Sequence, residues 1–175
     1  MKLDNKIKII NGYPFDSKDF NLDKIGYPVI KIKELKQGSV QITKDTSYAN
    51  YNEQLAPFLI RNGDFLVALT GNPPNKGGFD AIVGRCCKYK LDNAALLNQR
   101  VCKVLSDSPD LDNEYLYYFL SLESTTKNLA TRCTGSANQA NISSKDIKDL
   151  HVDLPPIEIQ HHIVNTTSSL LLKSL

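Results

Sequence analysis

The chain has 175 residues, of which 41% are hydrophobic and 23% charged, and its formal net charge is +2. This length and balance predict one compact globular domain with its own core and exclude a polybasic protein. No apolar run approaches the roughly 20 residues of a membrane-spanning helix, and MKLDNKIKII lacks the long apolar run of a secretory signal. We therefore expect a cytoplasmic protein with reduced cysteines.

The charge is distributed unevenly along the chain. Residues 61–103 carry seven basic and three acidic side chains, whereas residues 104–175 carry five basic and nine acidic ones. A basic middle followed by an acidic last third indicates one side of the protein that faces a polyanion. A solvated surface with uneven charge would give the same counts.

The first two thirds of the chain predict short β-strands. Their sequences are β-branched or alternate between apolar and polar residues, and Gly, Pro, Asn and Asp bound them. The predicted strands cover residues 6–10, 28–35, 39–43, 64–70, 80–84 and 100–105. Alternation in the second strand places Ile30, Ile32 and Glu34 on one face. GNPPNKGG, residues 71–78, is predicted to be a loop because it is rich in Gly and Pro.

Helical signals come late in the chain. Asp112 can cap a helix over residues 113–124, and Ser143 with Asp146 matches the S-x-x-D capping pattern at the start of a short helix over residues 144–150. Strands interspersed with helices, without a regular βαβ alternation, favour a mixed α+β domain.

The C-terminal segment predicts a last strand and an amphipathic helix. The strand covers residues 151–154, and the two prolines that follow end it and suit the first turn of a helix. Apolar residues then recur at helical spacing and form a stripe. Such a stripe needs a partner, which is either the domain's own surface or another chain. The predicted contact residues of this stripe are Ile157, Ile163, Val164, Leu170 and Leu171.

Catalytic motifs are mostly missing from the sequence. GNPPNKGG lacks the GxxxxGK[ST] order of a phosphate-binding loop, and no G-x-S-x-G elbow occurs. His161 and His162 point about 100° apart on a helix, so they cannot chelate a metal as an i, i+4 pair. We expect no catalytic, cofactor or metal site in this chain. The alternative is a small cysteine- or zinc-dependent enzyme, whose irregularly spaced ligands would be Cys87, Cys102, Cys133 and His151.

The remaining chemistry is that of amides and hydroxyls. Residues 134–141, TGSANQAN, combine both kinds of side chain, Arg132 precedes them, and residues 98–100, NQR, have the same character. In a DNA groove, Asn and Gln can pair with adenine and Arg with guanine, while Ser and Thr reach bases or phosphates. An Asx-rich connection that satisfies its own backbone would have the same composition.

Six segments, in order along the chain, resemble the target recognition domain of the specificity subunit of type I restriction–modification systems. They are NGYPFDSKDFN, GYPVIKIKELKQGSV, NGDFLVALTG, LNQRVCKV, DNEYLYYFLSLES and GSANQANISSKDIKDLHVDLPPIEIQHHI. The last segment is the most specific, because it is similar to the family's GS-x-Q-x-N-I-S…LPP-x-x-x-Q exit into a long helix.

The resemblance implies a non-catalytic, sequence-specific domain that binds one half of a bipartite site in double-stranded DNA. Methyltransferase subunits and restriction/translocase subunits would assemble on it, and the methyltransferase partner would hold S-adenosylmethionine. A full specificity subunit has two recognition domains and two long helices, so this chain would be a half-subunit, able to form a homodimer through its C-terminal helix, or a truncated one. The alternative is the specificity module of another split methyltransferase system.

Pattern and resemblance together predict a mixed α+β fold. A curved β-sheet domain with peripheral helices would cover residues 1–153 and recognise DNA, and residues 154–175 would start a spacer or dimerisation helix. Phosphates would be neutralised by basic residues of the middle of the chain, namely Lys76, Arg85, Lys88 and Arg100. The other predicted DNA contacts are Tyr13, Arg132, Ser136, Asn138 and Gln139.

Overall fold

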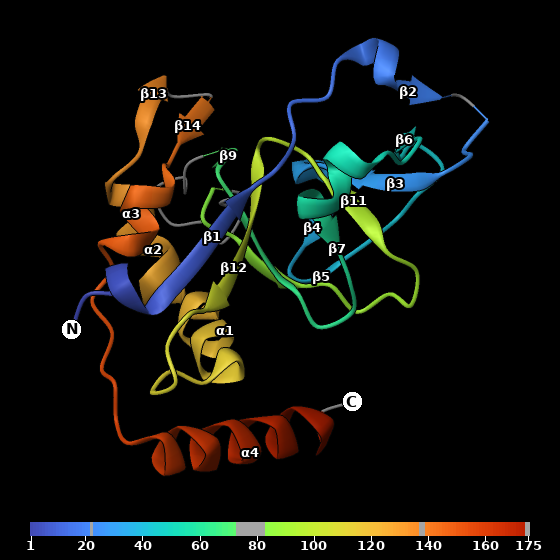
Figure 1. The fold of residues 1–175 in the computed structure, drawn as a ribbon. Helices are drawn as coiled ribbons and strands as arrows, with labels where there is room; N and C mark the ends of the chain where they lie inside the picture. The colour runs from blue at the N-terminus through green and yellow to red at the C-terminus, as the bar shows by residue number, and fades with distance from the viewer. Residues whose placement is uncertain (22, 73–82, 137–138, 174–175) are drawn as a thin grey trace.

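The structure, a computed structural model, describes residues 1–21, 23–72, 83–136 and 139–173. Two mixed β-sheets pack side by side, and three helices cover the outer face of one of them (Figure 1). A fourth helix at the C-terminal end of the chain lies below the first (Figure 1). This arrangement confirms the predicted α+β class with mixed sheets and peripheral helices.

The first sheet has six strands over the described residues. Their order is β1 (Ile7–Asn11), β12 (Val101–Ser106), β8 (Phe65–Ala68), β10 (Cys86–Lys88), β5 (Gly38–Val40) and β4 (Leu35–Lys36). β1 pairs with β12 in antiparallel register from Ile7–Ser106 to Asn11–Cys102, whereas β10 and β5 run parallel. Four of the predicted strands thus find their counterparts in β1, β5, β8 and β12.

β8 is buried along its whole length because both faces of the first sheet are covered. Phe65 stacks on Tyr117 of the first helix, with ring centroids 4.9 Å apart, and Val67 joins the core under the helices. Leu66 and Ala68 point to the other side, into the core shared with the second sheet. A strand covered on both faces is expected to be apolar throughout, as FLVA is.

The second sheet has five strands over the same described ranges. Their order is β2 (Phe20–Asn21), β6 (Tyr48–Ala49), β3 (Tyr27–Ile30), β11 (Ala95–Leu97) and β7 (Leu59–Ile60). β11 and β3 are parallel, with Leu97 opposite Ile30. A separate core packs on this sheet and includes Phe15, Val29 and Leu55.

The predicted strand over residues 28–35 is wrong beyond Ile30. A 3-10 turn, η3 (Ile32–Glu34), breaks it into β3 and β4. Glu34 is 2% exposed, as its predicted position on the inner face requires. Its carboxylate accepts hydrogen bonds from the Lys31 amide at 3.0 Å and the Thr46 hydroxyl at 3.1 Å. A buried carboxylate needs such partners, and the turn supplies one that a straight strand would not.

Three helices lie against the first sheet: α1 (Asn113–Ser121), α2 (Glu123–Thr131) and α3 (Ser144–Lys148). The predicted caps are confirmed, since Asp112 accepts from the Tyr115 amide at 2.9 Å and Ser143 forms the capping box with Asp146. α2 was not predicted. It begins directly after Leu122, whose extended backbone separates it from α1 and whose side chain offers no cap.

The C-terminal helix, α4 (Ile157–Lys173), starts after the predicted prolines. The predicted strand over residues 151–154 is wrong, because only His151 forms a β-bridge, with Lys2. Next to this bridge, the Val152 amide donates to the Met1 carbonyl at 2.8 Å. Of the strand predicted over residues 80–84, residues 80–82 lie outside the described part, and residues 83–84 form a turn. The predicted loop at 71–78 is described only for residues 71 and 72.

Short 3-10 helices complete the described elements: η1 (Asp4–Lys6), η2 (Ser17–Asp19) and η4 (Glu53–Phe58). Within the described residues, every helix is too short or too polar to cross a membrane.

Candidate nucleic-acid interface

Three chain segments meet at one end of the first sheet, where β1 ends, β12 begins and β8 ends. Gly12 follows β1 and donates its amide to the Val101 carbonyl at 3.0 Å. The Gln99 amide donates to the Tyr13 carbonyl at 2.9 Å, and the Leu69 amide donates to the Arg100 carbonyl at 2.9 Å. These bonds bring residues 11–13, 69–71 and 98–100 together, and we call this place the sheet end.

A small three-stranded sheet includes residues 70 and 71 and so adjoins the sheet end (Figure 1). Its strands are β13 (Thr134–Ser136), β14 (Gln139–Asn141) and β9 (Thr70–Gly71). The amide-rich segment 134–141 is therefore a β-hairpin, not an irregular connection, and β14 pairs with β9 with Ala140 opposite Gly71. Alternating small polar residues gave no apolar periodicity by which a strand could be predicted.

Side-chain hydrogen bonds join the hairpin and the start of α3 to the sheet end. The Thr70 hydroxyl donates to the Asn141 carboxamide oxygen at 2.8 Å. The Ser144 hydroxyl donates to the Asn11 carboxamide oxygen, also at 2.8 Å. Thr70 is buried and Asn141 is exposed. A buried hydroxyl therefore orients a carboxamide on the surface. Thr70, Ser144 and Asn11 were not predicted as site residues, because their proximity depends on pairing between distant segments.

Of the predicted DNA contacts, Tyr13 and Arg100 lie at the sheet end, and Arg85 pairs with Ala68, the last residue of β8. Arg100 is exposed. Tyr13 is half-buried and its ring packs edge-on against Phe15 and Phe58, with centroids 4.9 and 5.4 Å away. The Arg85 carbonyl accepts from the Ala68 amide, and its guanidinium donates to the Leu35 carbonyl at 3.0 Å.

Lys88 and Arg132 lie elsewhere. Lys88 is opposite Phe65, at the other end of β8, where its ammonium forms an ion pair with Glu114 of α1. Arg132 joins the end of α2 to α3 through bonds to the Asn128 carboxamide at 3.0 Å and the Asp146 carbonyl at 3.2 Å. Both cations therefore have internal partners in the structure.

The remaining predicted contacts are Lys76, Ser136, Asn138 and Gln139. Ser136 pairs with Gln139 in the backbone register. The side chains of these two residues, and all of Asn138 and Lys76, lie outside the described part of the structure.

Lys31, near the sheet end, was not predicted as a DNA contact. The Asn98 amide donates to the Ile30 carbonyl at 3.1 Å, which brings the residue after β3 close to residues 98–100. The Lys31 ammonium lies 2.8 Å from the Ser47 hydroxyl and 3.8 Å above the centre of the Phe20 ring. Burial, followed by repulsion from Lys33, lowers the pKa of Lys31, although Glu34 opposes this. In the sequence, Lys31 and Lys33 alternate with apolar residues and were expected on the outer face of a strand. Ordinary solvent-exposed lysines show the same pattern.

A hollow of about 280 Å³ opens beside Tyr13. Tyr13 and Phe15 line it together with side chains that can donate, accept or carry charge: Lys18, Asp19, Asn50 and Asn52. The hollow thus extends the polar surface of the sheet end towards η2 and β6.

The cysteines form neither a nucleophile nor a metal site in the structure. All four are free thiols. Burial raises the pKa of Cys87 and Cys102 to about 12 and also raises the pKa of Cys86 and Cys133, so none is activated as a thiolate. Among the described residues, no three His, Cys, Asp or Glu side chains are grouped so that they could hold a metal ion.

The predicted apolar stripe of α4 is divided between two sides of the helix. Ile157 and Val164 are half-buried on the side that faces α1, where the Ser168 and Tyr118 hydroxyls lie 2.9 Å apart. Ile163 and Leu170 are 37% and 63% exposed, and Ile159 is 49% exposed at the same helical spacing. The Leu171 side chain lies outside the description.

Comparisons with known proteins match almost the whole chain. The family model for the type I restriction modification DNA specificity domain matches residues 1–173. The type I restriction enzyme EcoBI specificity subunit of Escherichia coli is 27% identical over 174 residues, which cover 98% of this chain and 32% of that subunit. The chain thus spans about a third of the length of this relative.

Solved structures share the fold. A chain from a structure of complex assembly and conformational transition in a type I R-M system superposes with a TM-score of 0.69 at 18% identity, covering 98% of this chain and 37% of that one. The HsdS subunit from Thermoanaerobacter tengcongensis gives a TM-score of 0.67 at 19% identity, covering 99% and 37%. Because the family model matches residues 1–173 of this chain, the chain belongs to the family of type I restriction–modification DNA specificity domains.

Proposed function

We propose that this domain binds duplex DNA sequence-specifically and reads one half of a bipartite site for a type I restriction–modification system. The observation that carries the proposal is the convergence of amides, hydroxyls and an exposed arginine at the sheet end, in a chain of this family. Amides and arginine are the side chains that distinguish base pairs in a major groove.

Phosphate contacts would come from cations at or near the sheet end. Arg100 is exposed there, and Lys31 directly follows Ile30, whose carbonyl accepts from the Asn98 amide. Burial and then repulsion from Lys33 lower the pKa of Lys31, and a phosphate that contacts both ammonium groups would relieve the repulsion. Lys88 has Glu114 as its partner at the far end of the sheet, so its share of the binding energy would be smaller.

Base contacts would come from the hairpin and from residues 98–100. Because the Asn141 carboxamide oxygen is held by Thr70, its amide nitrogen is the group that Asn141 would present to an acceptor on a base. Gln99 is exposed beside Arg100. Ser136, Asn138 and Gln139 remain predicted base contacts because their hydroxyl and carboxamide groups can pair with base edges.

Assembly would use the C-terminal helix. The exposed apolar residues Ile159, Ile163 and Leu170 would pack against a second helix, from another recognition domain or from a second copy of this chain. Methyltransferase and restriction subunits would bind the resulting pair. S-adenosylmethionine would be held by the methyltransferase, and this chain would act in the cytoplasm without a cofactor of its own.

Selection from a random duplex-DNA library tests the proposal, with the protein alone and with a type I methyltransferase subunit. We expect enrichment of a short motif whose length fits one domain, and a longer bipartite motif when two copies assemble. Salt-sensitive binding without any motif under both conditions would contradict sequence readout.

A further inference from the structure

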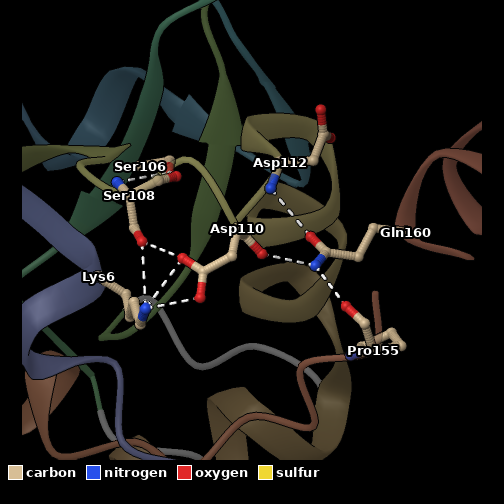
Figure 2. Close-up of polar contacts among 7 residues, drawn as sticks. All are labelled: Lys6, Ser106, Ser108, Asp110, Asp112, Pro155 and Gln160. Carbon is tan, nitrogen blue, oxygen red and sulfur yellow. Dashed lines mark hydrogen bonds and ion pairs between the residues drawn. The ribbon is translucent and has the colours of Figure 1, made fainter. Parts of the chain in front are cut away.

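Gln160 is fully buried although it lies in the first turn of α4 (Figure 2). Its amide nitrogen donates to the carbonyls of Asp110 and Pro155, both at 2.8 Å. Its carboxamide oxygen accepts from the Asp112 amide at 2.9 Å. One side chain thus bonds to three backbone groups, two of which belong to the connection between β12 and α1.

The connection that Gln160 holds is fixed from its other side as well (Figure 2). The Lys6 ammonium lies 2.7 Å from the Asp110 carboxylate and 3.2 Å from the Ser108 hydroxyl. The Asp112 carboxylate caps α1 through the Tyr115 amide. The backbone that receives Gln160 is therefore tied to η1, to β12 and to α1, so it provides a rigid anchor point.

The contacts require a side chain with the length of glutamine and with both donor and acceptor atoms. Asparagine is one methylene shorter, and glutamate has no donor for the two carbonyls. An apolar residue would leave two carbonyls and one amide without their partner in a buried place, which is unfavourable.

We propose that Gln160 is a positioning residue that fixes the direction of α4 relative to the two sheets. This inference rests on the proposed function, because in a bipartite site the direction of this helix sets the spacing between the half-site read here and the next one. A helix of this length extends about 25 Å, so a tilt of ~10° at its first turn moves its far end by about 4 Å. That displacement is comparable with the rise of one base pair.

Distance measurements between two spin labels test the inference without DNA. The labels would be placed at exposed positions in the domain and on α4, as Asn93→Cys and Asn165→Cys, with Cys133→Ser removing the one thiol that is not buried. We expect one narrow distance distribution, broadened or shifted by several ångströms in Gln160→Met. His162→Met is the matched control, because His162 is exposed on the same helix. It should leave the distribution unchanged.

A second measurement needs no variant. In the unsubstituted protein, NMR should show slow exchange with solvent for the Gln160 side-chain amide and the Asp112 amide. Fast exchange of either group would overturn the inference, as would equal distance distributions in Gln160→Met and the control.

Gln160→Met should still select the same half-site as the unsubstituted protein, while two assembled copies of the variant should tolerate more spacer lengths. A parent that selects no motif would count against the proposed function alone, since the distances are measured independently of DNA.

Discussion

The buried hydroxyl of Thr70 holds the exposed carboxamide of Asn141 at 2.8 Å, although 71 residues separate the two. The bond lies alongside the backbone pairing of β9 with β14. It thereby connects the hairpin that carries most of the predicted base contacts to the sheet end. Orientation of the hairpin is therefore coupled to the core through this pair.

Thr70→Val should weaken DNA binding more than it weakens the fold. The freed Asn141 oxygen is exposed and can bind water, so the loss in free energy of unfolding should stay below about 1 kcal/mol. DNA affinity should fall about tenfold, which corresponds to about 1.4 kcal/mol, because the amide is no longer oriented. Thermal unfolding and a binding titration measure the two effects. The same substitution at Thr125, buried in α2, is the control and should leave affinity unchanged.

Arg100→Gln should reduce both the affinity for DNA and its dependence on salt. Removing one phosphate contact lowers the slope of log K against log salt concentration by about 1. Lys88→Gln removes the same charge at the opposite end of β8, where the ammonium is paired with Glu114, and should leave the slope nearly unchanged. Titrations at several salt concentrations compare the two variants. Equal slopes in both would show that Arg100 contacts no phosphate.

Gly12→Ala should disrupt the sheet end itself. A Cβ atom at residue 12 would lie 2.1 Å from the carbonyl oxygen of Asn98, which is backbone and cannot move aside cheaply. We expect a loss in free energy of unfolding of about 3 kcal/mol, at the upper end of typical overpacking. Gly38→Ala is the comparison, because its φ of +72° is strained but no atom lies within 4 Å of the added Cβ. Chemical denaturation should find Gly12→Ala clearly the less stable of the two.

Local signals in the sequence predicted the elements that depend on near neighbours. Asp112 and the Ser143–Asp146 pair cap helices through bonds within four residues, and both caps form. The strand at 100–105 has the burial expected for β-branched residues, and it appears as β12. Arg100 and Tyr13 were predicted separately as DNA contacts, from residue type and the family resemblance, and the backbone brings both to the sheet end.

The missed features depend on contacts between distant segments. η3 forms because Glu34 finds Thr46 and the Lys31 amide, and no periodicity in residues 28–35 encodes that. The hairpin at 134–141 also pairs with β9, a strand from a distant part of the sequence. Gln160 is the glutamine of the LPP-x-x-x-Q segment that carries the family resemblance, but its burial was not predicted. Two of its three partners, the Asp110 carbonyl and the Asp112 amide, belong to a segment distant in the sequence.

Acid should weaken the ion pair between Asp110 and Lys6 in the β12–α1 connection, to which Gln160 of α4 binds. Hydrogen bonds from Lys6 and then Ser108 lower the pKa of Asp110 to about 2, against an ordinary value of 3.8. A carboxyl whose pKa is lower in the folded state stabilises the fold above its unfolded pKa, and this contribution disappears as the pH falls through the folded value. The stability that Asp110 supplies should therefore be complete above about pH 4 and be lost between pH 4 and 2.

Lys6→Met tests this linkage, because it removes the main cause of the lowered pKa. Its unfolding free energy should fall less steeply between pH 4 and 2 than that of the parent, since Asp110 would titrate at similar pH in the folded and unfolded states. Asp149, whose pKa Lys145 and Lys2 also hold near 2, keeps its share of the slope in both proteins. Lys18→Met, at an exposed lysine of η2, is the control for the loss of one positive charge. A Lys6→Met curve parallel to those of the parent and of Lys18→Met would show that the Lys6–Asp110 pair does not contribute to acid stability.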